Sequence, residues 1–229
     1  MTLEACSYIH RASAVYCLPI SPAEWRFLRR LNPKAVNLFR TIYKQGVPFS
    51  DAYDEIENKL MTEAKKKSRV VYAVPGNPAF YAFPVHKMLE VAAEEGLRTV
   101  IAAGISSFDL LLTELQIEVG YEGAQLYNAL LLEEQRPPLD INSHCFIFQI
   151  GVLGLKKINQ KRGRSSSSLR GVQNYLLKFY DKKHPCHAIL FMPDRTLRTE
   201  RISFSIDKLT RMSNKLHIGH TLYIPPRSS

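Results

Sequence analysis

The sequence predicts an α/β protein of two domains, a parallel α/β first domain and a mixed, strand-rich second domain. Helix and strand patterns alternate through residues 1–120, an order typical of a parallel sheet covered by helices. Residues 121–229 contain a succession of strand patterns with one amphipathic helix among them, which favours antiparallel pairing. The 229 residues suit two domains of about 110 residues each. We therefore expect an N-terminal α/β domain over 1–120 and a C-terminal α/β domain over 121–229.

Each element of the first domain has a local signal. Ser21, Pro22 and Glu24 combine a capping box with proline at the first helical position, so a helix is expected to begin there. A helix beginning at Ser50 has an amphipathic stripe that starts at Tyr53. Further helices are expected over 81–95 and after a capping-box pattern at 106–109. The expected strands span 14–18, 35–39, 69–74 and 99–103, the last two of the buried type.

The second domain is predicted from short apolar runs. Its expected strands span 125–127, 144–152, 187–192, 198–205 and 220–224. One amphipathic helix, with apolar residues at 169, 172, 176, 179 and 180, interrupts them. The polar stretch 160–168 is of low complexity, and we expect it to be mobile.

The composition argues against several classes of protein. No stretch approaches the roughly 20 apolar residues that a membrane helix needs, and the amino terminus does not resemble a secretory signal. The four cysteines, Cys6, Cys17, Cys145 and Cys186, are scattered, without a CxxC pair or a histidine at ligand spacing. We therefore expect reduced, buried thiols in a cytoplasmic protein, and neither a structural metal nor a disulfide framework.

The positive charge is concentrated in the second half. Residues 121–229 carry 17 basic and 8 acidic residues, against 14 and 13 in residues 1–120. The segment 156–183 holds most of the excess, and it would attract nucleic acid or another acidic partner. Aromatic residues are almost absent from it before Tyr175, which favours a solvated surface. Both interpretations stay open.

Two loops that follow strands are the candidates for ligand binding. They lie at 74–78 and 103–107, after the expected strands 69–74 and 99–103. Open α/β sheets bind ligands at the carboxyl ends of their strands, where glycine lets a ligand approach the backbone and serine begins a helix. Gly104 could equally permit a turn, and Ser106 could only cap a helix.

Taken in order, the motifs resemble a known superfamily. VVYAVPGNP, VIAAGISSFDLLLTELQI, GAQLYNALLL and HCFIFQIGVLG follow one another as the motifs of the tetrapyrrole methylases do. The spacing from Gly76 to Gly104 agrees with that pattern. Within the superfamily the chain most resembles the borosin-type peptide backbone N-methyltransferases, through residues 125–129, 148–151 and the carboxyl terminus HTLYIPPRSS. The resemblance covers nearly the whole chain except 160–168.

The resemblance implies an S-adenosylmethionine-dependent methyltransferase that acts on a peptide or small-molecule acceptor. It places the cofactor between the two domains and implies a homodimer. The residues that would bind the cofactor are Gly76, Asn77, Phe80, Tyr81, Gly104, Ser106, Ser107, Tyr127, Gln149, Ile150 and Gly151. Tyr43 and Tyr53 resemble the family's catalytic tyrosines, and Tyr43 is the better candidate because Tyr53 also fits the apolar stripe of its helix.

The sequence departs from the family pattern in three places. Phe49 stands where the borosin-type enzymes have arginine, and Asn77 stands where their loop has Asp or His. The sequence begins with MTLEA, which resembles the segment after the family's first strand and Gly-rich loop, so we expect a truncated start or a misassigned start codon. No fused core peptide is expected after residue 224. These departures leave a second hypothesis, a degenerate, non-catalytic binding module of the same fold.

Overall fold

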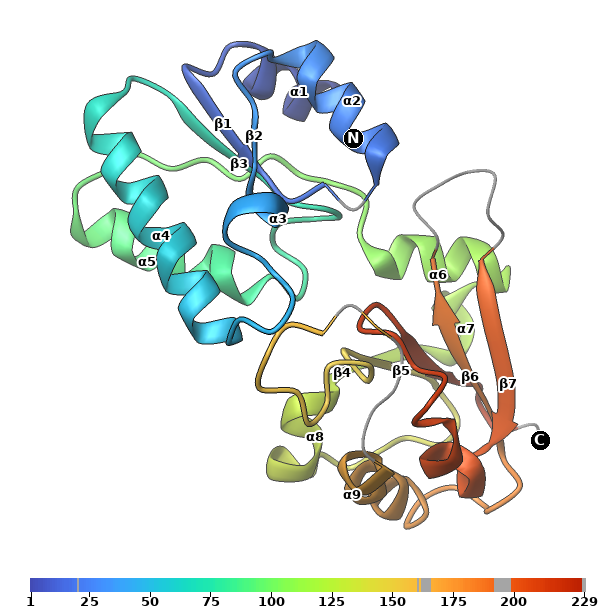
Figure 1. Ribbon diagram of the computed structural model, residues 1–229. Coiled ribbons are helices and arrows are strands. Elements are labelled where there is room, and N and C mark those ends of the chain that lie inside the picture. The colour runs from blue at the N-terminus through green and yellow to red at the C-terminus, as the bar shows by residue number, and fades with distance from the viewer. Residues whose placement is uncertain (20, 160, 162–165, 192–198, 228–229) are drawn as a thin grey trace. The chain divides into compact units, whose positions relative to one another are not determined.

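The computed structural model describes residues 1–19, 21–159, 161, 166–191 and 199–227 of the chain (Figure 1). The chain divides into two compact units, Met1–Leu110 and Leu111–Ser229. The sequence analysis set the domain boundary slightly further along, at residue 120, and that boundary stays a prediction. Each unit has its own sheet.

The sheet of unit 1 has three parallel strands in the order β2-β1-β3, namely Val36–Asn37, Ala14–Cys17 and Val70–Ala73 (Figure 1). The parallel pairing confirms the sequence prediction for the first half. All four residues of β1 are buried, because strands flank it on both sides. β3 is only half-buried along its length, although its apolar sequence predicted a buried strand. The strand predicted over 35–39 is shorter than expected, because Leu38 begins a helix.

Helices cover both faces of this sheet. They are α1 (Leu3–His10), α2 (Pro22–Leu31), α3 (Leu38–Thr41), α4 (Phe49–Lys66) and α5 (Phe83–Glu94). α2 begins with the predicted capping box of Ser21 and Glu24. Val15 and Cys17 pack against α1 and α2, whereas the ring of Tyr16 lies 5.4 Å from the Nζ of Lys59 on α4. Alternate residues of β1 therefore face opposite layers, as expected for a strand between two helical layers.

The segment 99–103, predicted as a buried strand, is not a strand in the structure. Val100 is 58% exposed and Ile101 40% exposed, despite their β-branched side chains. Among the described residues, β3 pairs with β1 alone, and no strand lies against the segment to form a ladder with it. A β-prone sequence becomes a strand only where a neighbour supplies backbone partners. The backbone oxygen of Ala103 instead accepts a hydrogen bond from the Thr2 hydroxyl at 3.0 Å.

Unit 2 contains a mixed five-stranded sheet in the order β4-β5-β8-β6-β7. The strands are Ala124–Asn128, His144–Phe148, Thr221–Ile224, Pro185–Leu190 and Glu200–Ser205. Only β4 and β5 are parallel, and the remaining pairs are antiparallel. The mixed, strand-rich second unit therefore agrees with the sequence prediction. β5 ends at Phe148, earlier than the predicted 152, because Gln149 turns the chain with a φ of 61°.

The other elements from residue 107 onward are α6 (Ser107–Leu115), α7 (Val119–Glu122), α8 (Ala129–Gln135), α9 (Ser166–Leu176) and the 3₁₀ helix η1 (Ile206–Met212). One face of the sheet, with Cys145, Ile147 and Leu222, packs against α8, α9 and η1. α9 begins inside the stretch 160–168 that was expected to be mobile. Residues 160 and 162–165 of that stretch lie outside the described residues.

The cysteines are unpaired thiols. Cys17, Cys145 and Cys186 are buried, and burial raises the pKa of each to about 12. Thiols with raised pKa values are poor nucleophiles, so their roles are in packing. Within the part of the chain that the structure describes, no helix is both long and apolar enough to cross a bilayer.

Candidate active site

The two candidate loops of unit 1 meet backbone to backbone. A Cβ atom added to Gly104 would lie 2.2 Å from the carbonyl oxygen of Gly76 and 3.3 Å from the Cα of Asn77. Gly76 has a φ of +82°, whereas Gly104 is not among the residues of positive φ. Glycine is therefore required at 76 by the backbone conformation and at 104 by the close approach of the other loop. The structure thus brings together the two loops that the sequence singled out.

Aromatic side chains extend the contact between these loops. The rings of Phe80 and Phe108 stack with centroids 6.4 Å apart, and Phe80 meets Tyr81 edge to face at 4.8 Å. Tyr81 has a φ of 50°, a left-handed conformation that is uncommon for an aromatic residue. Backbone strain of this kind persists where the surroundings fix it, often at ligand sites.

The polar side chains of the loops make local hydrogen bonds. Asn77 Oδ1 accepts from the backbone N–H of Ala79 at 2.9 Å. Ser106 accepts from the backbone N–H of Asp109 at 3.2 Å, and both its hydroxyl and its N–H donate to the Asp109 carboxylate at 2.6 Å. These bonds hold the pKa of Asp109 below its ordinary value. The structure therefore confirms the capping box, and Ser106 supports the start of α6.

Gly104→Ala is expected to weaken cofactor binding at least about tenfold, because its methyl group would displace the Gly76 loop. Gly96→Ala is the control. Gly96 has a φ of +67° and open space around its Cα, so this change should lower stability without altering affinity. Titration calorimetry with S-adenosylhomocysteine, alongside thermal unfolding, measures both effects. Equal affinities in the two variants would contradict a ligand role for the loop.

Tyr43 and Tyr53, the two candidate catalytic residues, lie together in an aromatic cluster of unit 1. Their rings stack with centroids 6.1 Å apart, and Phe39 meets Tyr43 edge to face at 5.2 Å. Phe49 completes the group, 6.2 Å from Tyr43 and 6.1 Å from Tyr53. Tyr53 is half-buried, whereas Ala52 and the next turns of α4 form its buried stripe. Tyr53 therefore stands at the margin of the packed face of α4.

The two hydroxyls are hydrogen-bonded to each other, and their acidities differ. Burial, and then the charge that Tyr53 would carry and the hydrogen bond to it, raise the pKa of Tyr43 far above its ordinary value. Burial also raises the pKa of Tyr53, but the bond from Tyr43 lowers it. The hydrogen bond between the two hydroxyls thus favours the phenolate of Tyr53 over that of Tyr43.

Tyr72 on β3 is a third tyrosine of this environment, which the sequence analysis missed. Its pKa is raised by burial and by the charge that Tyr53 would carry as a phenolate. The only sequence signal for the position of Tyr72 is the alternation of side chains along β3. Tyr72 pairs with Tyr16 across the parallel ladder, so the two side chains point to the same helical layer. That layer contains α4.

Four of the predicted ligand residues belong to unit 2, at β4 and at the end of β5. The hydroxyl of Tyr127 donates to Gln125 Oε1 at 3.0 Å, and its ring packs against the core of the unit. Gln149 has a φ of 61°, and its Oε1 is buried without a hydrogen-bond partner among the described residues. Ile150 is fully buried. A Cβ on Gly151 would lie only 1.8 Å from the oxygen of His217.

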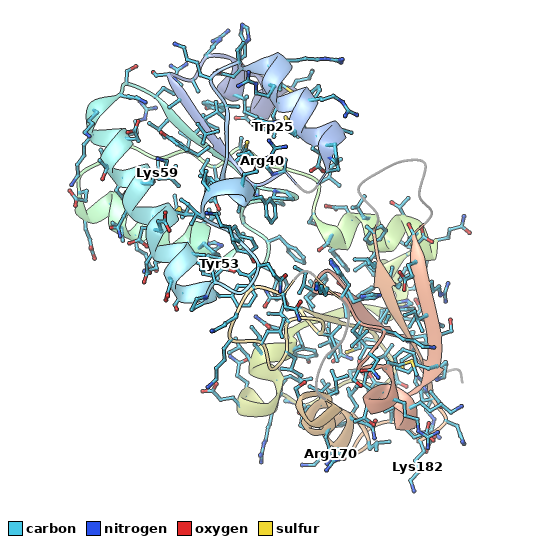
Figure 2. All side chains as sticks on the ribbon, in the orientation of Figure 1. Trp25, Arg40, Tyr53, Lys59, Arg170 and Lys182 are labelled. Atoms are coloured by element: carbon cyan, nitrogen blue, oxygen red, sulfur yellow. The ribbon has the colours of Figure 1, made fainter. Side chains whose placement is uncertain are left out.

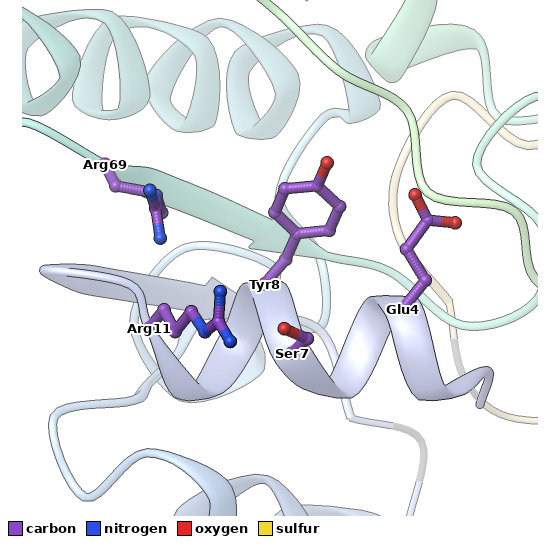
Figure 3. Close-up of a pocket in the computed structure, with 5 residues that line it drawn as sticks. All are labelled: Glu4, Ser7, Tyr8, Arg11 and Arg69. Carbon is purple, nitrogen blue, oxygen red and sulfur yellow. The ribbon is translucent and has the colours of Figure 1, made fainter.

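Two surface depressions of unit 1 are defined by the residues that line them. One, of about 280 Å³, is lined by Glu4, Ser7, Tyr8, Arg11 and Arg69 (Figure 3). Tyr8 stands on α1 next to β3, and the two arginines come from the end of α1 and the start of β3. The second, of about 270 Å³, lies between α4 and α5 and includes Tyr53, which Figure 2 labels on α4. Only the second depression contains a predicted catalytic residue.

The described lysine and arginine residues of the segment 156–183 are exposed on unit 2, whereas its apolar residues, such as Leu169 and Leu176 of α9, are buried in the core. Arg162 and Arg164 fall outside the described residues. Arg170 and Lys182 project outward from the unit (Figure 2), and Lys183 Nζ lies 3.6 Å from Asp207 Oδ2. This arrangement is that of a solvated surface, and binding of an acidic partner there stays a prediction.

Comparison with protein families gives a match over most of the chain. A family model described as Tetrapyrrole (Corrin/Porphyrin) Methylases matches residues 1–143. The methyltransferase/ribosomally synthesized cyclic peptide omphalotin A precursor of Omphalotus olearius is 27% identical over 230 residues, which cover 100% of this chain and 55% of that protein. The corresponding dendrothelin A precursor of Dendrothele bispora (strain CBS 962.96) is 28% identical over 232 residues, with the same coverage. The chain thus spans about half the length of these relatives.

Solved structures share the fold. The uroporphyrin-III C-methyltransferase of Thermus thermophilus, complexed with S-adenosylhomocysteine, has a TM-score of 0.65 at 15% identity and covers 98% of this chain and 90% of that one. Diphthine synthase has a TM-score of 0.62 at 15% identity, covering 100% and 85%. These similarities confirm the predicted two-domain α/β fold class.

Proposed function

The chain belongs to the tetrapyrrole (corrin/porphyrin) methylase family, and we propose that it transfers a methyl group from S-adenosylmethionine to a peptide acceptor. The observation that carries the proposal is the backbone contact between the Gly76 and Gly104 loops, which follow β3 and the segment 99–103. The peptide acceptor is supported by relatives whose names describe methyltransferases joined to cyclic peptide precursors.

The residues present fit this cofactor. The buried Oε1 of Gln149 is an acceptor without a partner among the described residues, so a donor group of a ligand would satisfy it. By resemblance to the family, the residues that would contact the cofactor are Gly76, Asn77, Phe80, Tyr81, Gly104, Ser106, Ser107, Tyr127, Gln149, Ile150 and Gly151. S-adenosylmethionine, when bound, supplies an electrophilic methyl group on a sulfonium. The protein's task is then to orient an acceptor and to remove one proton.

The tyrosine pair is suited to proton removal. A peptide nitrogen is a poor nucleophile, and methylation requires the loss of its proton. We assign the acceptance of that proton to Tyr53 as a phenolate, because Tyr43 donates a hydrogen bond to it and stabilises its charge. Phe49 contributes no charge, so the oxyanion of the amide has no cation from this position, where the related enzymes have arginine.

The assembly and location are further proposals. We propose a homodimer, since the tetrapyrrole methylases that the chain resembles pair and Leu126, Leu130 and Leu131 of unit 2 are at least 37% exposed. We propose the cytoplasm, because four unpaired cysteines suit a reducing compartment.

Titration calorimetry with S-adenosylhomocysteine tests the cofactor assignment. We expect saturable binding by the native chain and at least about tenfold weaker binding by Gln149→Ala, which removes the unpartnered acceptor. Gln173→Ala is the matched control, because the Oε1 of Gln173 already accepts from the backbone of Thr210 at 2.9 Å. Absence of binding by the native chain would favour the non-catalytic module.

A further inference from the structure

The depression between α1 and the start of β3 contains two arginines that the proposed methyl transfer does not use. Its volume is about 280 Å³, and the residues that line it are Glu4, Ser7, Tyr8, Arg11 and Arg69 (Figure 3). Among the described residues, neither guanidinium group forms an ion pair, and neither does the carboxylate of Glu4. The depression therefore presents charged groups of both signs that the fold leaves available to a ligand.

The sheet brings the two arginines to the same place. Arg11 is the C-cap of α1, and Arg69 precedes β3. The backbone N–H of Ser13 donates to the carbonyl oxygen of Arg69 at 2.9 Å, and the hydroxyls of Ser13 and Ser68 are 3.1 Å apart. These contacts join the end of the α1 segment to the start of β3. The backbone positions of both arginines are thus fixed, while their side chains stay exposed.

The arginine end of the depression is suited to a phosphate group. Two guanidinium groups that line one small depression repel each other, and an oxyanion between them would replace this repulsion with attraction. The planar fork of N–H donors in arginine matches the oxygens of phosphate, to which it donates two hydrogen bonds. A phosphate monoester carries a charge of about −1.5 to −2 at neutral pH, which two arginines neutralise. The hydroxyl of Ser7 is a further donor in the same depression.

The other end of the depression is suited to a nucleobase. The half-buried ring of Tyr8 lies between the two arginines and Glu4 (Figure 3). Aromatic side chains stack on bases, because every base has a π-face. The carboxylate of Glu4 accepts hydrogen bonds and donates none, so it suits the N–H edge of a base. Glu4 and Arg11 are separated by seven positions, or roughly 10 Å along a helix, a span comparable to that from a phosphate to the far edge of its base.

We propose that this depression binds a nucleoside monophosphate, with the phosphate on Arg11 and Arg69, the base on Tyr8 and the donor edge of the base at Glu4. Guanine fits best, because its ring N–H and its exocyclic amino group present two adjacent donors to one carboxylate. Arg69 precedes β3 and the Gly76 loop follows it, so the phosphate site and the candidate cofactor loops belong to opposite ends of that strand. The nucleotide site is therefore separate from the proposed cofactor site and does not depend on methyl transfer.

Titration calorimetry with guanosine monophosphate tests the site. S-adenosylhomocysteine is present at saturation, so that the nucleotide does not occupy the proposed cofactor site. We expect saturable binding by the native chain and at least about tenfold weaker binding of guanosine, which lacks the phosphate. Arg11→Ala and Arg69→Ala should each weaken the nucleotide at least about tenfold. Arg30→Ala is the matched control, because Arg30 is exposed on α2 and does not line the depression, and it should change affinity less than about twofold.

Two further variants test the contacts with the base. Tyr8→Leu removes the stacking ring and should weaken guanosine monophosphate about tenfold. Glu4→Gln replaces one acceptor oxygen with a donor and should reduce the preference for guanosine monophosphate over uridine monophosphate at least about fivefold. Thermal unfolding of each variant confirms that its fold is intact.

Three results would overturn the proposal. Equal affinities for guanosine and its monophosphate, or equal effects of Arg69→Ala and Arg30→Ala, would contradict the phosphate contacts. Equal affinities for inorganic phosphate and guanosine monophosphate would show that the arginines bind an anion without a base. Loss of nucleotide binding when S-adenosylhomocysteine is added would place the nucleotide in the cofactor site instead.

Discussion

Tyr43→Phe is expected to reduce turnover at least about tenfold while S-adenosylhomocysteine affinity changes by less than about a factor of two. The reason is that Tyr43 donates the hydrogen bond that stabilises the Tyr53 phenolate. Tyr53→Phe removes the proton acceptor itself and should reduce turnover at least as much. Steady-state methyl transfer to an end-blocked peptide of alternating glycine and valine measures turnover, and calorimetry measures affinity. Phe39→Leu, which alters the same cluster without removing a hydroxyl, is the control.

The pH dependence follows from the same pair. Burial raises the pKa of Tyr53 above its ordinary value of 10.0, so its phenolate form is scarce near neutral pH and grows as the pH rises. Turnover should therefore climb from pH 7 upward without a plateau below pH 10.

Phe49→Arg places a cation within the cluster, which should lower the pKa of Tyr53, shift the rise to lower pH and increase turnover near neutrality. Unchanged turnover in Tyr43→Phe together with lost activity in Phe49→Arg would contradict proton removal by the pair.

Gly151→Ala is expected to lower the free energy of unfolding of unit 2 by about 2–3 kcal/mol. An added Cβ would lie 1.8 Å from the His217 oxygen and 2.7 Å from its carbonyl carbon, and backbone atoms cannot rotate away as a side chain does. The turn after β5 must then shift, and Gln149 shifts with it, so cofactor affinity should fall too. Chemical denaturation and calorimetry measure both effects.

Gly120→Ala is the matched control for this change. Its Cβ would meet only the end of the flexible Glu118 side chain at 3.0 Å, and Gly120 is in helix α7. Alanine is favoured over glycine in a helix by about 0.5–1 kcal/mol, so stability should stay the same or rise. A similar loss of stability in both variants would show that the contact between Gly151 and His217 is not tight.

Local sequence signals predicted the elements that depend on neighbours along the chain. The capping boxes at Ser21 and Ser106 both form, and the apolar stripe of α4 buries Ile56 and Leu60. The parallel and antiparallel pairing of the two sheets followed from the order of strand and helix patterns. The loops of Gly76 and Gly104 were both singled out as candidates, because each follows a predicted strand.

Features that depend on contacts distant in sequence could not be predicted. The segment 99–103 has strong β propensity, but whether it forms a strand depends on a partner, and none lies beside it in the described chain. Tyr72 on β3 is close enough to Tyr53 on α4 for a Tyr53 phenolate to raise its pKa, and this proximity joins residues distant in sequence. Phe83 looked like an ordinary helix residue, and its 69% exposure beside Tyr53 becomes visible only in three dimensions.

Transfer of a labelled methyl group tests the central claim most directly. The chain is incubated with S-adenosylmethionine that carries an isotopic methyl label and with the valine–glycine peptide, and fragmentation by mass spectrometry locates the label. The account predicts a methyl group on a backbone nitrogen, formed by the native chain and at least about tenfold more slowly by Tyr43→Phe. Cofactor binding without any transfer to the peptide, or transfer at an equal rate in Tyr43→Phe, would contradict it.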